Sequence, residues 1–452
     1  MSPSSPRSVA DQRAALPPRL LVSLYFGWAH ACLLAAFLLM AGNPGWFTQF
    51  FYDPRTIAVV HLVTLGWIST SILGALYIVA PTALKTPLAA GPGDYGALAF
   101  LVLGTSGMVA HFLLSRYEGM YVSALMVWLA LAHVGARVMR AQRRVAIPGA
   151  VKLHINLAFA NILVAAAIGI ALGIDKSRSF LPGNVLSNVY AHAHLAAIGW
   201  AGMMIMGVGY RLFPMVLPAA MPAGNRLYAS ALLLEAGLLG LIPFQLLQHR
   251  WLGAFVLLIA AGFGAFLLEI HRMRSNRRPP AAHLPRPDYG TLHSLQALAY
   301  LVVSIAMGGV LAFAPESELT FRLAPVYGFI GLVGFLAQMV VGMESRLLPM
   351  FSSLHVLVTS GGLSLLQQET LNRRLHAVVF PLWTLGLPTV AWGLLAGAPG
   401  LIRIGACLLV LAQLLTSLAA LRWLRRAHAG PASFPSPPPL PGGTGITISS
   451  GP

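Results

Sequence analysis

Three histidines inside long apolar stretches are the clearest candidates for chemistry in this sequence. His61 lies in the stretch 55–80, and His192 and His194 lie near the start of the stretch 187–212. Neutral imidazole is a good ligand for metals and haem iron, and an imidazole without a partner is costly in lipid. Because each helical residue turns the chain by about 100°, His192 and His194 would face nearly opposite ways. They therefore predict ligands on two sides of one helix rather than one shared metal.

The elements that hold these histidines are predicted to be membrane-spanning helices. Of the 452 residues, 57% are hydrophobic and only 9% are charged, whereas a soluble domain usually has about 25% charged residues. Twelve mostly apolar stretches are long enough to cross a bilayer. They lie at 19–42, 55–80, 94–115, 119–141, 151–174, 187–212, 226–248, 251–271, 290–314, 322–345, 376–397 and 400–423. The sequence thus predicts an all-α integral membrane protein with about twelve transmembrane helices.

The distribution of basic residues predicts the orientation of the chain. The formal net charge is +17, and Lys and Arg concentrate in the leader, in the segments 137–152, 272–286 and 346–374, and after residue 422. With twelve spans, all these segments fall on one side of the membrane. The positive-inside rule places that side, and both termini, in the cytoplasm. We therefore expect a multi-pass protein of a bacterial inner membrane, with the lipid bilayer as its environment and no nucleic-acid partner.

The chain divides into a leader, a membrane domain and a tail. We expect a cytoplasmic leader at 1–18, a membrane domain at 19–424, and a disordered tail, rich in Pro, Gly and Ser, at 429–452. The two cysteines, Cys32 and Cys407, both lie in apolar stretches. They exclude a disulfide scaffold, a zinc cluster and a C-x-x-C-H attachment site for covalent haem.

An internal repeat organises the membrane domain. At an offset of 133 residues, the second span aligns with the sixth, and at a further offset of 135 the sixth aligns with the tenth. The matched positions are His61 with His194, Gly66-Trp67 with Gly199-Trp200, Gly74 with Gly207 and Gly342, Tyr77 with Tyr210, Arg211 with Arg346, and Pro81 with Pro214 and Pro349. Phe329 stands where the third histidine would be. We expect three four-helix units, at about 19–141, 151–271 and 290–423, related by a pseudo-threefold axis.

Other polar residues within the spans are secondary candidates. Four more histidines are candidates for haem ligation, namely His30, His111, His154 and His293. The alternative for each is a structural hydrogen bond to another helix, and we favour that role for His154 and His293. Glu235, the one clearly intramembrane acid, is a candidate for proton transfer, with a hydrogen-bonded protonated carboxyl group as an equal alternative.

Haem is the cofactor that these residues favour. We expect His61, with His192 or His194, to ligate the iron of a haem b in the outer third of the membrane. Two imidazoles would make a low-spin centre suited to electron transfer, and one would leave a position open for a gas. The glycines at 66, 74, 199 and 207 would let the flat macrocycle approach the helix backbone. No copper site is apparent in the sequence, and copper is doubtful.

At these residues the sequence resembles a known family. Twelve spans in three four-helix arcs, with histidines in the outer third, resemble the catalytic subunit (subunit I) of the haem-copper oxidases. The run from His192 and His194 through Gly199-Trp200 to Pro214 is similar to the H-x-H helix of the cbb3-type oxidases. The resemblance implies two haems on opposite faces of this helix, with His61 as the other low-spin haem ligand. In the oxidases this helix is the tenth, whereas here it is the sixth, and the seventh span lacks the histidine pair of a copper site.

The sequence as a whole predicts a haem-b-binding membrane protein in electron transfer or diatomic gas chemistry, with oxygen or nitric oxide as the gas. The resemblance implies a cytochrome oxidase or nitric oxide reductase if the protein is an enzyme, with cytochrome c or quinol as electron donor and other respiratory subunits as partners. The architecture also resembles the NnrS-type haem- and copper-containing membrane proteins associated with nitric oxide stress. The alternative is a transporter, or a permease that handles metal or haem, because internal repeats also occur in transporters. A purely structural assembly subunit is a third reading.

Overall fold

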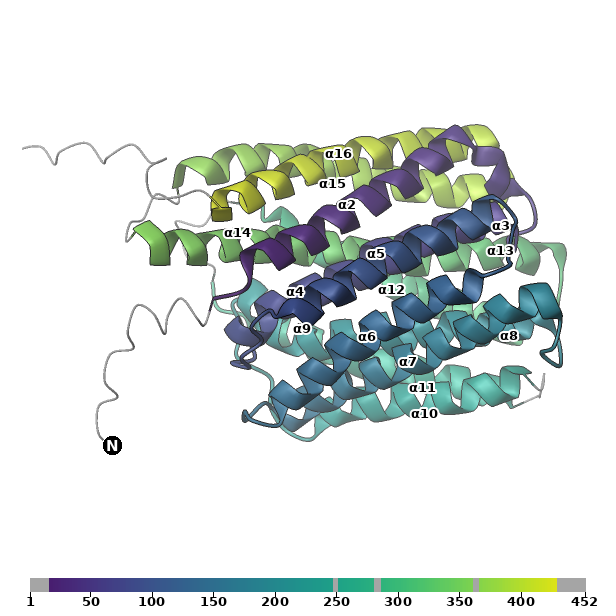
Figure 1. Cartoon of the computed structure of the whole chain (residues 1–452), viewed down its shortest axis with the longest axis horizontal. Coiled ribbons are helices and arrows are strands. Elements are labelled where there is room, and N and C mark those ends of the chain that lie inside the picture. The colour runs from purple at the N-terminus through teal and green to yellow at the C-terminus, as the bar shows by residue number, and fades with distance from the viewer. Residues whose placement is uncertain (1–15, 247–250, 280–285, 361–365, 429–452) are drawn as a thin grey trace, which may run out of the picture.

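A computed structural model shows a bundle of long helices that run side by side (Figure 1). It describes residues 16–246, 251–279, 286–360 and 366–428. The structure is 85% helical, and the described residues contain no strand. Within these ranges, twelve helices are long and apolar enough to cross a membrane. These findings confirm the predicted all-α membrane class, whereas most of the predicted leader (1–15) and the whole tail (429–452) lie outside the described residues.

The first unit contains four membrane-crossing elements. They are α2 (Arg19–Gly42), the continuous span of α3 (Pro54–His61), η2 (Leu62–Ser69) and α4 (Thr70–Thr82), α5 (Pro92–Leu113), and α6 (Met120–Gln142). A short 3-10 helix, η1 (Pro44–Thr48), follows α2.

The second and third units repeat this order. The second has α7 (Gly149–Arg178), the span of α8 (Val185–His194), η3 (Leu195–Gly202) and α9 (Met203–Val216), α10 (Arg226–Leu246) and α11 (Leu252–Ser275). The third has α12 (Tyr289–Phe313), the span of α13 (Glu318–Phe329), η4 (Ile330–Ala337) and α14 (Gln338–Ser360), α15 (Leu366–Ala396) and α16 (Pro399–His428).

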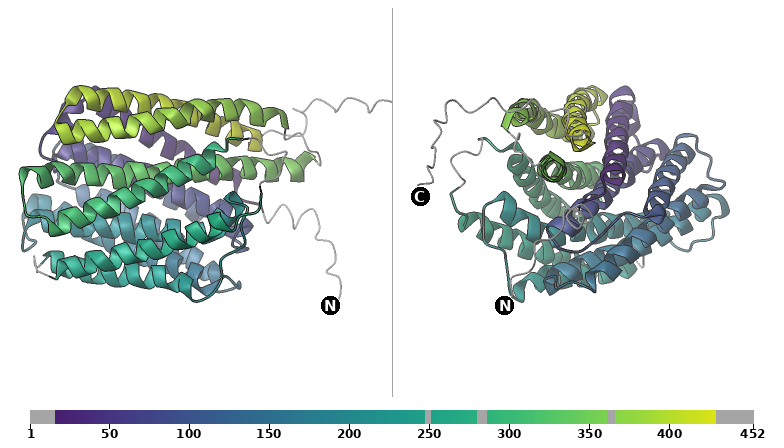
Figure 2. Two further views of the ribbon diagram at one scale, coloured as in Figure 1. Left: turned by 180° about the vertical axis from the view of Figure 1, so that it is seen from behind. Right: turned by 60° about the vertical axis from the view of Figure 1, so that its left-hand side comes forward.

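The contacts between helices follow the same pattern in all three units. The second span packs against the third helix, as α3 on α5, α8 on α10 and α13 on α15. The third helix packs against the fourth, and the fourth packs against the first helix of the next unit, as α6 on α7, α11 on α12 and α16 on α2. The last of these contacts closes a ring of helices around a pseudo-threefold axis. The right-hand view of Figure 2 shows the bundle from nearer the helix ends.

The tenth span is longer than the sequence predicts. The expected span ended at residue 345, but α14 continues to Ser360. Leu348 and Phe351, which fell in the expected basic loop, are almost fully buried. Their burial against neighbouring helices outweighs the nearby basic residues and keeps this segment helical.

Each central span contains eight residues of π-helix directly after the histidine position. The π-helical segment η2 follows His61, η3 follows His194 and η4 follows Phe329. The three segments begin 133 and 135 residues apart, which are the offsets at which the sequence aligns with itself. They contact one another, and their spans are the three most buried of the twelve. Because π-helical turns are rare and are frequent at functional sites, these three segments make the centre of the bundle a candidate functional region.

The central spans also begin alike, at a polar side chain that caps the helix. The Asp53 carboxylate accepts a hydrogen bond from the backbone N–H of Arg55, and Asn184 and Ser317 accept equivalent bonds at the start of α8 and α13. Such caps satisfy backbone donors that a helix start leaves free. All three caps lie at the same end of the bundle, on the right in Figure 1.

The repeated glycines pack the first helix of each unit against its central span. A Cβ atom built at Gly66 would lie 2.5 Å from Cβ of Cys32, and one at Gly199 would lie 2.9 Å from Cβ of Asn161. The expectation that a flat macrocycle approaches the backbone at these glycines is therefore wrong. A neighbouring helix already fills the space.

The same contacts set the register between the first helices of the units. A Cβ atom at Gly74 would meet Cβ of Tyr25 at 2.8 Å, and one at Gly207 would meet Cβ of His154 at 2.5 Å. Tyr25, five residues before His30, is thus the structural counterpart of His154. His30 therefore lies further along its helix than the position equivalent to His154 does.

Candidate functional site

Two of the three main candidate histidines lie on either side of the boundary between the first and second units. His61 is the last residue of α3, and His192 lies in the last turn of α8. The two imidazoles lie within electrostatic range of each other. Each unit therefore contributes one imidazole to a common site near the end of the bundle at which α3 and α8 begin.

The two imidazoles are held by the same kind of hydrogen bond. Nδ1 of His61 donates to the carbonyl oxygen of Ile57 at 2.9 Å, and Nδ1 of His192 donates to that of Ala165 in α7 at 2.8 Å. A carbonyl oxygen only accepts, so Nδ1 carries the proton and Nε2 carries the lone pair. Neither Nε2 atom has a hydrogen-bond partner within the described part of the chain. Metal-binding histidines use this arrangement, in which one nitrogen is anchored and the other is free to ligate.

The surroundings of the pair fix the two rings but leave them partly open. Phe112 of α5 stacks on His61, with ring centroids 5.2 Å apart. His192 lies over Gly169 of α7, where an added Cβ atom would come within 3.0 Å of Cε1 of the ring. Both histidines are only half-buried, although their spans are among the most buried. They border accessible space rather than a closed core.

The third candidate, His194, faces the third unit. Its Nδ1 donates to the carbonyl oxygen of Tyr190 at 2.8 Å, and its Nε2 lies 3.4 Å from the hydroxyl group of Tyr327 in α13. The His194 and Tyr327 rings stack with centroids 6.1 Å apart. His192 and His194 therefore point toward different units, as the turn of an α-helix requires. Sequence reasoning missed Tyr327 as a partner, although the offset of 135 residues places it at the position of His192.

The repeat relates these two pairs. Tyr327 precedes Phe329 by two residues, just as His192 precedes His194. Tyr327 also packs against a glycine of the unit's first helix, because a Cβ atom at Gly308 would lie 3.4 Å from its ring. The corresponding residues at the third boundary are Phe329 and Val59. The three equivalent positions thus carry two imidazoles, an imidazole with a phenol, and two hydrocarbon side chains.

Three of the secondary histidines bond to nearby protein groups. His154 uses both ring nitrogens, with Nδ1 on the carbonyl oxygen of Ala150 at 2.7 Å and Nε2 on the hydroxyl group of Ser230 at 3.0 Å. Both ring nitrogens of His30 also have side-chain partners. Nδ1 of His111 bonds to a carbonyl oxygen just beyond the end of α5. The structure therefore leaves no free nitrogen on His30 or His154 for an iron.

Glu235 joins three elements of the second unit. Its Oε2 accepts a hydrogen bond from Nδ2 of Asn161 at 2.9 Å, and the same amide lies 3.2 Å from the carbonyl oxygen of Gly199 in η3. Glu235 is not the one intramembrane acid, because Glu344 lies within the tenth span and is only 4% exposed. Glu344 was missed because it lies two residues before Arg346, at what the sequence presents as the end of the span.

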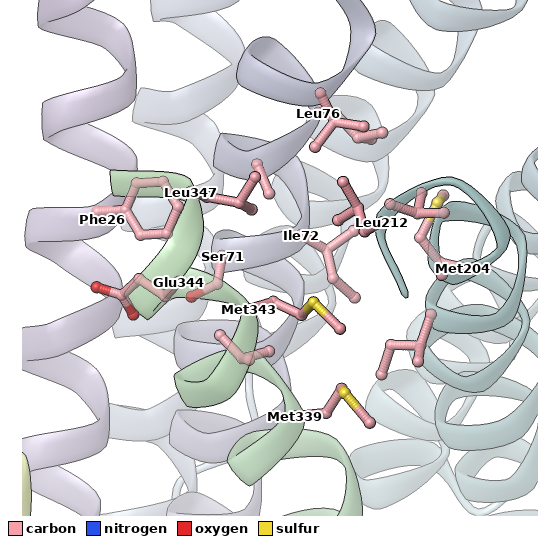
Figure 3. A pocket seen from close by; sticks show the side chains of 16 residues that line it. Phe26, Ser71, Ile72, Leu76, Met204, Leu212, Met339, Met343, Glu344 and Leu347 are labelled. Atoms are coloured by element: carbon pink, nitrogen blue, oxygen red, sulfur yellow. The ribbon is translucent and has the colours of Figure 1, made fainter. Parts of the chain in front are cut away.

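A cavity of about 70 Å³ lies on the pseudo-threefold axis, beyond the π-helical segments (Figure 3). Five residues of α4 line it, together with the residues that the two offsets place opposite them in α9 and α14. These residues of α4 are Ser71, Ile72, Ala75, Leu76 and Val79. The volume has room for a few water-sized molecules. The cavity is thus a product of the repeat, and almost all its lining is apolar.

Two further findings bear on this site. Within the described residues, no group of three or more His, Cys, Asp or Glu side chains is arranged to hold a metal ion. No family model matches the chain, and no curated protein matches it. The geometry itself defines the class, which is a twelve-span helical membrane protein of three pseudo-equivalent units with histidines at two of the boundaries between them.

Proposed function

We propose that this protein binds a haem b between its first and second units, and that His61 and His192 are the residues that would hold its iron. The observation that carries the proposal is a pair of imidazoles within electrostatic range of each other, each with Nδ1 anchored on a carbonyl oxygen and with no hydrogen-bond partner for Nε2 among the described residues. The donor set fits a haem because neutral imidazole is an ordinary axial ligand of haem iron. The bound haem would supply one-electron transfer.

The residues of this chain would orient and shield that group. The carbonyl oxygens of Ile57 and Ala165 hold the two rings in the ligating tautomer. Their hydrogen bonds also make the Nε2 lone pair a stronger ligand for a metal. Phe112 packs on His61 and keeps water from one side of its ring. The site therefore favours a stable electron-transfer centre. The single imidazole of His194, beside the Tyr327 hydroxyl group, is better suited to a site that leaves a position open for oxygen or nitric oxide.

The resemblance to the haem-copper oxidase catalytic subunit supports an oxidoreductase role for such a protein. In that role the protein would lie in an inner membrane with both termini in the cytoplasm. It would receive electrons from cytochrome c or a quinol, alone or with other respiratory subunits. The copper-dependent part of that chemistry is not included in the proposal, because the sequence offers no copper ligands in the seventh span.

A reduced-minus-oxidised absorption spectrum of the purified full chain tests the proposal, together with a pyridine haemochrome assay. We expect the spectrum of a low-spin haem b, and its loss or conversion to a high-spin form in His61→Ala and in His192→Ala. His271→Ala is the control, because His271 is exposed near the end of α11. No haem in the wild type, or an unchanged spectrum in both variants, would refute the proposal.

Transport remains the second candidate function, and the axial cavity is the observation that favours it. Equivalent residues of three repeats surround this cavity, and an acidic residue, Glu344, lies in its wall. Internal repeats around a central site are common in transporters. Metal-dependent uptake by proteoliposomes, measured with protein that contains no haem, would support transport and not electron transfer.

A further inference from the structure

A second polar cluster lies between the third and first units, separate from the His61–His192 site. It brings together His30 of α2, His293 of α12, Glu344 of α14 and His376 of α15, four residues from four different helices. His30, His293 and Glu344 are all buried. Titratable groups are rare within membrane spans and are usually functional there. Neither the repeat nor the haem proposal explains this cluster.

The Glu344 carboxyl group is the centre of the cluster. Its Oε1 lies 2.6 Å from Nε2 of His30, whose Nδ1 lies 3.0 Å from the side-chain amide nitrogen of Gln413 in α16. That amide donates, so Nδ1 carries the lone pair and the Nε2–H group of His30 points at the carboxyl group. Oε2 of Glu344 is buried and has no hydrogen-bond partner among the described residues. One oxygen is therefore held in place while the other is free to accept a proton.

A second, smaller cavity lies beside Glu344. Its volume is about 10 Å³, and Glu344, His376 and Thr416 are among its lining residues. That volume is about enough for one water molecule. Glu344 also lines the axial cavity, but Figure 3 shows its carboxyl group turned toward the helix that carries Phe26. Glu344 thus separates the axial cavity from a water-sized space next to His376.

The remaining titratable groups extend from Glu344 toward one end of the bundle. His376 lies within electrostatic range of both Glu344 and His293. Nδ1 of His376 and Nε2 of His293 are buried and lack hydrogen-bond partners within the described residues. Arg374, two residues before His376, is exposed. On the other helices packed here, α16 faces Glu344 with the uncharged Gln413 and Thr416, and α4 contributes Ser71 to the same cavity wall.

We propose that Glu344 is a proton-accepting site and that His376 passes protons to it from the end of the bundle at which α14 and α16 end. In this step an N–H bond of the His376 imidazolium breaks and the O–H bond of the Glu344 carboxylic acid forms, directly or through one water molecule. Bulk water then returns a proton to His376, and no other bond changes. The Nε2–H group of His30 holds the carboxylate while it is charged. This site operates whether or not haem binds at His61 and His192.

Infrared difference spectroscopy of the full chain in detergent, recorded between pH steps, tests the assignment to Glu344. We expect a C=O band of a protonated carboxylic acid that appears as the pH falls and is absent from Glu344→Gln. Glu235→Gln is the matched control, because Glu235 is also an intramembrane acid but has a fixed partner in Asn161. If Glu344→Gln does not fold, Glu344→Asp must show the band at a shifted frequency. A band that persists in Glu344→Gln, or is unshifted in Glu344→Asp, would overturn the proposal.

The rate of deuterium exchange at the same carboxyl group tests the path through His376. A positioned acid–base group typically accelerates proton transfer by 10²–10⁴-fold, so we expect His376→Leu to slow this exchange by roughly a hundredfold. A structural role for His376 would leave the exchange rate unchanged, and that result would refute the path. Haem content is measured on the same samples. We expect it to be unaffected, so a failure of this proposal is distinct from a failure of the haem proposal.

Discussion

The indole Nε1 of Trp200 donates a hydrogen bond to the hydroxyl oxygen of Ser69, 3.0 Å away, and so ties η3 to η2 at the centre of the bundle. Trp67, the equivalent residue of the first unit, donates to the carbonyl oxygen of Ala337 in η4 at 3.2 Å. Ser69 and Ala337 are themselves equivalent in the repeat. The same contact is therefore made twice around the axis, each time from one π-helical segment to the next.

The third such contact is made by packing alone. Phe335 stands at the tryptophan position of the third unit and has no donor. It packs edge-on against Phe263 of α11, with ring centroids 6.3 Å apart. Phe263 also lies against Gly202, where a Cβ atom would come within 3.3 Å of it. The glycine at position 202 makes room for this aromatic contact in place of the hydrogen bond.

Replacement of Ser69 by alanine should destabilise the centre of the bundle. Trp200 and Ser69 are almost fully buried, so the variant would leave the indole N–H group without a partner. An unsatisfied buried donor costs about 1–3 kcal/mol. We expect a lower melting temperature in detergent for Ser69→Ala, with no change for Ser275→Ala, whose side chain is exposed. Equal melting temperatures for the two variants would contradict this role.

A methyl group at position 169 should disturb the haem site without harming the fold. The added Cβ atom of Gly169→Ala would lie 3.0 Å from Cε1 of His192 and push the ring off its anchor on Ala165. Loss of such an orienting contact typically weakens metal binding by roughly tenfold or more. Gly264→Ala is the control, because a Cβ atom there meets nothing within 4 Å. Haem titration should separate the two variants, and equal haem affinity would argue against His192 as a ligand.

Asp94 should contribute strongly to stability, unlike exposed ion pairs. It is fully buried, accepts a hydrogen bond from the Tyr77 hydroxyl group at 2.8 Å, and pairs with Arg137 at 2.6 Å. Breaking a buried pair of this kind costs about 3–5 kcal/mol. Glu318→Gln, which breaks an exposed pair with Arg322, should cost no more than about 0.5 kcal/mol. Thermal unfolding of Asp94→Asn and Glu318→Gln in detergent measures the contrast, and similar losses would contradict it.

The cap of α3 should depend on pH, whereas the cap of α8 should not. Hydrogen bonds from Arg55, chiefly from its side chain, hold the pKa of Asp53 below its ordinary value of 3.8. Because the folded-state pKa is the lower one, the carboxylate stabilises the fold above pH 3.8, and this contribution is lost as the pH falls through the folded-state pKa. The melting temperature of the wild type should therefore exceed that of Asp53→Ala at neutral pH and approach it in acid.

The cap of α8 provides the matched control for that prediction. Asn184 accepts a hydrogen bond from the backbone N–H of Leu186 at 2.8 Å and has no titrating group. Asn184→Ala should cost about 1 kcal/mol at every pH. A pH-independent gap for Asp53→Ala would show that its carboxylate contributes no more than an uncharged cap does.

The repeat explains why so much of the fold was predictable from the sequence. The aligned Gly66-Trp67 and Gly199-Trp200 pairs identify equivalent helices, and both tryptophans are almost fully buried. No local sequence pattern predicted the π-helical turns, because the contacts among the three segments select them. The glycines were misread because a pattern shows that a close approach occurs but not what approaches.

The site was less predictable because it depends on how the helices are rotated. The sequence marked His61, His192 and His194 but left open which of the latter two faces His61. Only the packing of α8 on α7 turns His192 toward the first unit and His194 toward Tyr327. Glu344 was missed because its place beside Arg346, at the end of the expected span 322–345, gave no sign that the fold buries it next to His30.

The π-helical segments divide each central span into two parts whose side chains point in independently set directions. A π-helical turn holds one residue more than an α-helical turn, so it rotates the part of the helix before it by about 100° relative to the part after it. Deleting one residue from η2 would swing His61 away from His192 and leave the axial residues from Ser71 to Val79 in place. The extra residue therefore sets how the part of the helix that carries the histidine is rotated relative to the part that lines the axial cavity. Because the halves are decoupled, the histidine position was free to become Phe329 in the third copy while the axial lining kept its threefold form.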